Sequence, residues 1–354
     1  MKSKKIIILP CLVIFLLTIL YIIFAVKPLA KEFQLIPEWK ISVLSPIIDK
    51  NLNEKETIYF KLGQELGYFT EEGKITFCQT FPFQASISDK YFSTYNSNAQ
   101  NTPFFDNKGN SKGFIEAAGY PYFIEENAFI FLPGGNSFSK VYDNGKTEWT
   151  YEGTIPLTAF SSKNSFTVTG FADGKIIIFD NHSGNIIGDY APGGSDYPVI
   201  LGIDISNDGK YVASISGQDK QRFVLSQAEN QKQKIIYHNF INEGSPYRTL
   251  VYFTKNNERV FYVYKNNIGI YNIKSEENFT IPISDKIINI EESEDFVFFL
   301  GKTKNIYTVY LIDKTNTLEG KFSFDAKSAF IRVFKNNLYI GNDTYISKIA
   351  LTRE

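Results

Sequence analysis

The chain has 354 residues, with 37 basic and 38 acidic side chains, 43% hydrophobic residues and only 2 cysteines. A chain of this composition can bury a large core, so a disordered tail, a collagen and a disulfide-stapled mini-protein are excluded. Only five of the basic residues are arginines, and the charges nearly cancel, which argues against a nucleic-acid partner.

Residues 6–26 form an uncharged stretch of 21 residues. As a helix this stretch is about 31 Å long, close to the thickness of the hydrocarbon core of a bilayer. We therefore predict one transmembrane helix at 6–26 that anchors the chain in the lipid bilayer. A cleaved signal peptide is the alternative, although its apolar region normally has only about 7–15 residues.

The lysines that flank this stretch indicate its orientation. Lys2, Lys4 and Lys5 precede it and Lys27 and Lys31 follow it, which favours a short cytoplasmic N-terminus at 1–5. The remainder is then extracytoplasmic, either periplasmic or external. Without residues 1–32, which hold five lysines and Glu32, the chain keeps 32 basic and 37 acidic groups, a net charge of −5. Such a domain has no charge-based reason to bind nucleic acid or anionic lipid.

Beyond the anchor, prolines recur at intervals of 36, 39, 35, 42, 48 and 36 residues, at Pro46, Pro82, Pro121, Pro156, Pro198, Pro246 and Pro282. Most of them precede an apolar run of β type, such as YPVILGIDI or SPYRTLVYF. Proline has no amide hydrogen for a sheet ladder, so it suits the first residue of a strand. The prolines therefore indicate a connection that is repeated in each unit.

Turn signals lie inside each period, including Glu72-Gly73, Lys108-Gly109, Asn144-Gly145, Asp173-Gly174, Asp208-Gly209 and the Asn-Asn pairs at 256, 266 and 336. The runs between them are rich in Val, Ile, Phe and Tyr. No stretch beyond the anchor has a sustained helical period. Units of about 40 residues with four short strands each are typical of a β-propeller, so residues 33–354 are predicted to form one all-β propeller domain.

Three stretches carry a family resemblance. Residues 158–194 (TAFSSKNSFTVTGFADGKIIIFDNHSGNIIGDYAPGG) resemble a WD-repeat blade, with Phe179-Asp180 at the Trp-Asp position. Residues 202–216 (GIDISNDGKYVASIS) resemble the strand-turn-strand opening shared by WD-repeat and quinoprotein-like propellers. Residues 140–153 (KVYDNGKTEWTYEG) are similar to the strand pair of quinoprotein-type repeats. The Gly-His dipeptide and the terminal Trp of full WD repeats are absent.

We predict eight blades, with seven as the alternative. The seven prolines and one further unit that starts near Lys327 give eight units with a mean spacing of about 40 residues. The last unit supplies three strands, at 328–334, 337–341 and 345–350. A strand at 33–43 is expected to complete it and to close the ring by pairing the two ends of the chain.

The sequence favours no catalytic, cofactor or metal site. His182 and His238 are the only histidines and only Cys78 accompanies them beyond the anchor, which is too few for a histidine-based zinc site. The segment Asp204–Gly209 begins like a calcium loop, but Ile215 stands where a bidentate Glu is required, so a hairpin turn is the expected structure. A quinone-dependent dehydrogenase is disfavoured because Trp39 and Trp149 are the only tryptophans.

The loops that precede each first strand are the candidate partner-binding site. In propellers these loops lie on one face together with the loops between the second and third strands. Aromatic residues and one arginine accompany the prolines there, namely Phe81, Phe83, Tyr120, Tyr122, Tyr197, Tyr247 and Arg248. Tyr and Arg are enriched at interaction hot spots. The alternative is that these side chains only pack loops onto their own blades.

Two functions remain open from the sequence. The first is a membrane-anchored interaction scaffold that binds another protein of the cell envelope, without enzymatic activity. The second is an extracytoplasmic hydrolase, lactonase or oxidoreductase with a metal or cofactor in the central channel. A sensor that signals through the membrane is disfavoured, because about five cytoplasmic residues are too few for a signalling module.

Overall fold

The computed structural model describes residues 14–21, 33–48, 56–96, 100–229, 232–242 and 244–353. The chain has two compact units. One holds residues 37–350, and the other holds residues 1–36 and 351–354. Within the predicted transmembrane stretch, residues 14–21 are helical, and the rest of 6–26, like residues 1–5, lies outside the described residues. No helix among the described residues is both long and apolar enough to cross a membrane.

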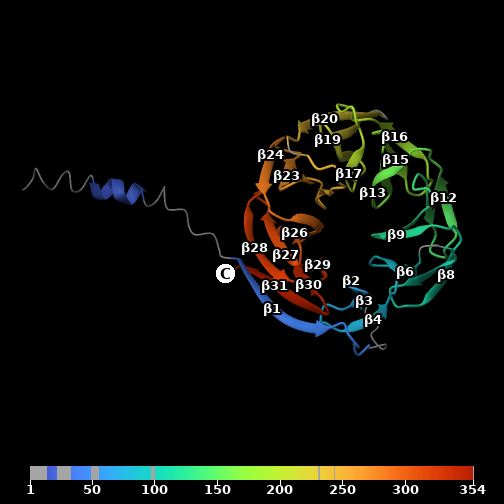
Figure 1. The fold of residues 1–354 in the computed structure, drawn as a ribbon. Coiled ribbons are helices and arrows are strands. Elements are labelled where there is room, and N and C mark those ends of the chain that lie inside the picture. The colour runs from blue at the N-terminus through green and yellow to red at the C-terminus, as the bar shows by residue number, and fades with distance from the viewer. Residues whose placement is uncertain are drawn as a thin grey trace, which may run out of the picture. The chain divides into compact units, whose positions relative to one another are not determined.

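The strands form eight antiparallel sheets arranged in a ring (Figure 1). The first, innermost strands are β2 (Ile58–Leu62), β5 (Gln84–Ile87), β9 (Tyr120–Ile124), β13 (Leu157–Lys163), β17 (Ile200–Ile205), β21 (Val251–Phe253), β25 (Lys286–Glu292) and β29 (Ala329–Phe334). The second strands are β3 (Glu65–Phe69), β6 (Tyr91–Tyr95), β10 (Asn127–Phe131), β14 (Phe166–Phe171), β18 (Tyr211–Ser216), β22 (Arg259–Tyr264), β26 (Phe296–Thr303) and β30 (Asn337–Asn342).

The third strands are β4 (Ile75–Thr80), β7 (Thr102–Asp106), β11 (Phe138–Val141), β15 (Ile176–Asp180), β19 (Arg222–Glu229), β23 (Asn267–Asn272), β27 (Ile306–Asp313) and β31 (Tyr345–Arg353). The outermost strands are β8 (Ser111–Ile115), β12 (Thr147–Tyr151), β16 (Ile186–Tyr190), β20 (Lys232–Phe240), β24 (Asn278–Pro282), β28 (Leu318–Asp325) and β1 (Phe33–Ser42). We number the blades 1 to 8 from β2–β4 to β29–β31, so the eight-bladed propeller predicted from the sequence is confirmed.

The closure of the ring also follows the prediction. The last sheet has the order β1-β31-β30-β29, so the first strand of the chain is the outermost strand of blade 8. Trp39 of β1 packs against Tyr339 of β30 and Phe69 of β3, with ring centroids 5.9 and 6.2 Å apart. Blade 8 is thus bound to blade 1 through a side chain that comes from the N-terminal strand.

The prolines mark the blades less regularly than expected. Pro82, Pro156 and Pro198 precede β5, β13 and β17 by one or two residues. Pro121 lies inside β9, which tolerates it because an innermost strand pairs on one side only. Pro282 is the last residue of β24 and not the start of a new strand.

Among the described residues, blade 1 has three strands, in the order β2-β3-β4, whereas each of the other blades has four. Because adjacent strands are antiparallel, the last strand of this blade, β4, runs in the same direction as β2. The chain then turns back into blade 2, so the innermost strand β5 runs opposite to β2. Lys61, near the end of β2, donates to Ala85 O at the start of β5 over 2.7 Å. Tyr68, which pairs with Tyr59 early in β2, donates to Ser88 O just after β5 over 2.9 Å. Nothing in the sequence predicts a blade with three strands.

The core consists of apolar layers between adjacent blades. One layer joins blades 5 and 6, where Phe223 stacks on Tyr262 with centroids 4.0 Å apart. Another joins blades 3 and 4, where Phe138 contacts Trp149, Phe160 and Phe179. Aromatic side chains bury large areas and favour stacked and edge-to-face contacts of this kind, which explains the high Phe and Tyr content of the sequence.

Candidate functional site

The two faces of the propeller differ in chemistry. We call loop face the face at which β5, β9, β13, β17, β21, β25 and β29 begin, and turn face the opposite one. The inner turns of the turn face, at 70–74, 88–90, 125–126, 164–165, 206–210, 254–258, 293–295 and 335–336, contain only Ser, Thr, Asp, Glu, Lys, Asn and Gly. The inner turns therefore stay hydrated and offer little apolar contact to a partner, whereas the outer turn between β11 and β12 on this face exposes Tyr142 by 50%.

The loop face exposes large apolar side chains on six consecutive blades. Phe83, Tyr197 and Tyr247, on blades 2, 5 and 6, are 69%, 65% and 71% exposed. Tyr120 of blade 3, Ile155 of blade 4 and Ile288 of blade 7 are 44%, 36% and 40% exposed. We call these six residues the apolar arc. Ile155 and Ile288 were not predicted from the sequence, which indicated aromatic residues and Arg248 at this face.

The remaining predicted site residues have other positions. Phe81 is only 4% exposed and packs in the layer between blades 1 and 2, so it is a core residue and we leave it out of the arc. Tyr122 packs edge-to-face on Phe160 with centroids 5.7 Å apart and faces the central channel. Arg248 is exposed on the loop before β21, and its Nε donates to Thr158 O of blade 4.

The two Pro-Gly-Gly loops, at 133–135 and 192–194, also lie on the loop face. Gly135 O accepts from the amide of Leu157 at the start of β13 over 2.9 Å. Pro192 O accepts from the Arg222 guanidinium. Leu157 begins the innermost strand β13 and Arg222 begins the third strand β19, and both strands start at the loop face.

The central channel contains a cavity of about 500 Å³ lined by the innermost strands of blades 3 to 7. Tyr122, Thr158, Arg248, Lys286 and Ile288 line the half toward the loop face, and Glu125, Lys163, Asp204 and Tyr252 line the half toward the turn face. Burial raises the pKa of Tyr122, while the nearby Arg248 charge acts in the opposite direction. Burial also raises the pKa of Glu125.

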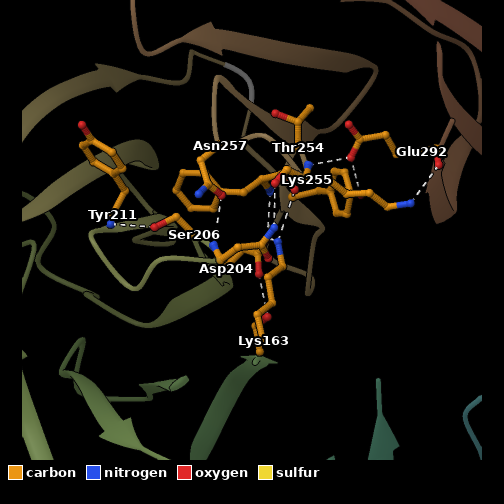
Figure 2. A network of polar contacts seen from close by, with 12 residues as sticks. Lys163, Asp204, Ser206, Tyr211, Thr254, Lys255, Asn257 and Glu292 are labelled. Carbon is orange, nitrogen blue, oxygen red and sulfur yellow. Dashed lines mark hydrogen bonds and ion pairs between the residues drawn. The ribbon is translucent and has the colours of Figure 1, made fainter. Parts of the chain in front are cut away.

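Polar side chains link the innermost strands from blade to blade around this channel, as Figure 2 shows for blades 4 to 7. The Lys163 ammonium of β13 lies 2.7 Å from Asp204 Oδ2 of β17 and 3.2 Å from Phe253 O of β21. Asp204 also accepts from the Ser161 hydroxyl over 2.6 Å and from the Phe253 amide over 2.7 Å. One buried carboxylate thus joins three blades.

We call these polar contacts between the innermost strands the belt. The belt continues to blades 7, 8 and 1. The Tyr252 hydroxyl and the Lys255 amide donate to Glu292 Oε2 over 2.8 and 2.7 Å. Glu291 pairs with Arg332 of β29 over 2.6 Å, and the Arg332 guanidinium lies 3.9 Å from the centre of the Tyr59 ring. Burial raises the pKa of Tyr59 to about 12, against the effect of the Arg332 charge. This hydroxyl is therefore protonated at neutral pH.

Blades 2, 3 and 4 are joined in a similar way. The Phe123 amide of β9 donates to Ser86 Oγ of β5 over 2.9 Å. The Asn164 amide donates to Glu125 Oε2 over 3.4 Å. The belt residues therefore form hydrogen bonds and ion pairs with one another, and these contacts satisfy their buried polar groups. In the part of the chain that the structure describes, no three His, Cys, Asp or Glu side chains are grouped so as to hold a metal ion.

The segment that begins like a calcium loop is a hairpin turn, as expected. Asp208 accepts from Ser206 Oγ and from the Lys210 amide over 2.6 and 3.1 Å. The Tyr211 amide donates to Ser206 Oγ over 2.8 Å (Figure 2). His182 lies exposed in the turn between β15 and β16. The first residue of the segment, Asp204, has the belt role that the sequence did not reveal.

Comparison with known proteins agrees with this fold. An uncharacterized protein of Treponema pallidum (strain Nichols) is 25% identical over 347 residues, which cover 95% of this chain and 92% of the relative. The crystal structure of BamB from Moraxella catarrhalis is similar with a TM-score of 0.62 and 12% identity, covering 90% of this chain and 100% of that chain.

Two further structures share the architecture. The computationally designed Ika8 protein has a TM-score of 0.58 and 12% identity, over 83% of this chain and 96% of that chain. A chain of the mitotic checkpoint complex has a TM-score of 0.56 and 11% identity, over 93% of this chain and 95% of that chain. At these identities the similarity concerns the fold alone. A family described as beta-propeller protein matches residues 1–353, and the chain belongs to this family.

Proposed function

We propose that this protein is a membrane-anchored, extracytoplasmic β-propeller that binds a partner protein of the cell envelope through its loop face. The observation that carries the proposal is the contrast between the faces. Six consecutive blades present a large apolar side chain on the loop face, whereas the inner turns of the turn face are entirely polar. Exposed apolar groups that gather on one side of a rigid domain are typical of protein-binding surfaces.

The location is the second part of the proposal. It is based on the uncharged length of residues 6–26 and on the lysines before it. The likeness of residues 158–194 and 202–216 to WD-repeat and quinoprotein-like blades is in keeping with a binding platform. A chain that is anchored at its N-terminus and carries a rigid ring of loops can hold a partner close to the bilayer.

The partner-binding claim is tested with the full-length chain in cells. Phe83, Tyr197 and Tyr247 are replaced by Ser, and crosslinked partners are identified by mass spectrometry after capture. We expect enriched envelope proteins with the wild-type chain and a loss of about tenfold or more with the triple variant, because buried aromatic anchors dominate interface energies. Undiminished capture would remove the loop face from the proposal.

A matched variant changes the turn face instead. Asn207, Lys255 and Glu294 lie in inner turns of blades 5, 6 and 7, and their replacement by Ser is expected to leave capture unchanged. Location is tested separately by protease treatment of intact cells and of spheroplasts. Cleavage of the propeller only after the cytoplasm is opened would contradict the extracytoplasmic placement.

A further inference from the structure

The half of the channel cavity toward the loop face has two cationic side chains without an acidic partner. Arg248 and Lys286 both line the cavity. Among the described residues, no carboxylate forms an ion pair with either of them, and the contact of Arg248 with Thr158 O is the one hydrogen bond of its side chain. The chain as a whole is slightly acidic, so two unpaired cations in one cavity are a local feature of this site.

The acidic groups of the cavity lie toward its other end and are already engaged. Asp204 is held by Lys163, Ser161 and the Phe253 amide. Glu125 follows the end of β9, on the turn face, and accepts from the Asn164 amide. The cavity therefore has two cations toward the loop face, and toward the turn face it has Lys163 together with the carboxyl groups of Asp204 and Glu125. An anion that enters from the loop face meets the two cations first.

Apolar and aromatic groups surround these cations. Phe160, Ile287 and Ile288 line the same cavity. Burial raises the pKa of the Tyr122 phenol, and the Arg248 charge is close enough to oppose part of this rise. A ligand that satisfies this site combines a carboxylate with adjoining apolar carbon atoms. Guanidinium groups bind carboxylates through well-oriented, charge-assisted hydrogen bonds, so Arg248 supplies the directional part of the contact.

We propose that the cavity binds an acidic side chain, in an apolar sequence context, of a peptide segment that belongs to the loop-face partner. This inference rests on the proposed function and specifies the chemistry of its partner. The cavity is continuous with the apolar arc: Arg248 follows Tyr247, Tyr122 lies two residues after Tyr120, and Ile288 belongs to both. A polypeptide across the loop face reaches arc and cavity together, whereas a free small acid reaches only the cavity.

The probe is a displayed library of short random peptides, selected on the purified full-length chain. We expect the enriched peptides to share an Asp or Glu beside apolar residues. A synthetic peptide from this selection binds the wild-type chain, and its affinity falls about tenfold or more in the R248Q/K286Q variant. Replacing the Asp or Glu of the peptide by Asn or Gln lowers the affinity for the wild-type chain by a similar factor. The changed peptide binds the R248Q/K286Q variant with little further loss of affinity, because both changes remove the same contact.

Matched variants separate this inference from the proposed function. Lys304→Gln and Lys327→Gln remove two loop-face lysines outside the cavity and leave the affinity unchanged. If Tyr197→Ser and Tyr247→Ser weaken the peptide while R248Q/K286Q does not, the loop face binds protein but the carboxylate site is wrong. If none of these changes weakens the peptide, both proposals fail.

A free organic acid is the competing source of the carboxylate. Thermal unfolding of the full chain is therefore measured with 3-phenylpropionate alone. Stabilisation of the wild-type chain but not of R248Q/K286Q, together with a selection that shows no preference for Asp or Glu, would assign the cavity to a small molecule and overturn the peptide claim. Thermal unfolding of each variant without ligand verifies that it is folded.

Discussion

The Lys163 ammonium and the Asp204 carboxylate lie 2.7 Å apart and join β13 to β17 inside the channel wall, with only 10% and 3% of their side chains exposed. Forty-one residues separate them in the sequence. Asp204 also receives the Phe253 amide, so this one pair fixes the relative positions of blades 4, 5 and 6. The energy of the pair depends on both partners being present, because a single buried charge is costly.

Replacement of Lys163 by Met is expected to lower the free energy of unfolding by about 3 kcal/mol, since it leaves the Asp204 charge buried without its counter-ion. The measurement is chemical denaturation of the full-length chain. The matched control is Lys175→Met, which breaks an exposed pair with Asp189 at 2.8 Å and is expected to cost less than about 1 kcal/mol. Equal costs for the two variants would contradict a stabilising role for the buried belt.

Replacement of Trp39 by Ala is expected to cost about 2–3 kcal/mol, because its ring fills the space between Tyr339 of blade 8 and Phe69 of blade 1. Its indole also donates to Glu71 O over 3.2 Å. Trp39→Phe keeps part of the packing and is expected to cost about half as much. Phe114→Ala, on the exposed face of β8, serves as the control and is expected to change stability by less than about 0.5 kcal/mol.

Much of the fold could be predicted because each blade repeats its own local signals. Gly and Asn-rich turns lie between runs of β-branched and aromatic residues, and the closing strand follows from a last unit that is one strand short. The three-stranded blade could not be predicted in this way. The residues between β4 and β5, Phe81–Phe83, carry the same proline signal as the other blades, although no fourth strand precedes it.

The site was predicted less completely than the fold. Tyr197 and Tyr247 are exposed on the loop face as expected, but Phe81 points into the core although Pro82 alone separates it from the exposed Phe83. Such alternation depends on the exact course of a short loop. Lys163 and Asp204 are brought together only by the packing of adjacent blades, and no spacing in the sequence relates them. Long-range polar pairs of this kind require the structure.

Substitution of Gly174 by Ala is expected to cost about 2–4 kcal/mol. This residue has a φ of +84° in the turn between β14 and β15, and a Cβ atom there would lie 2.5 Å from Pro198 O of the next blade. Both the left-handed backbone and the collision contribute. Gly193 has a φ of +68° with nothing within 4 Å of its Cβ position, so Gly193→Ala isolates the backbone cost of about 1 kcal/mol.

Thermal unfolding of both glycine variants measures the difference. A smaller loss for Gly174→Ala than for Gly193→Ala would show that the contact between the Gly174 turn and Pro198 is not close in solution. A larger loss for Gly174→Ala supports the role of this proline in packing blade 4 against blade 5, beyond its position before β17.

The thiol of Cys78 is expected to react slowly with iodoacetamide at neutral pH. Burial and the adjacent Glu65 carboxylate raise its pKa to about 12, and its Sγ lies 3.7 Å from both Glu65 Oε2 and Val43 O. A free cysteine has a pKa of about 8.5, and the thiolate is the reactive form. The rate, measured in a Cys11→Ser background, is therefore expected to rise with pH up to about 11 without a plateau. Glu65→Gln removes the negative charge, lowers the thiol pKa and accelerates alkylation, whereas a plateau near pH 9 in the unchanged chain would contradict this environment for Cys78.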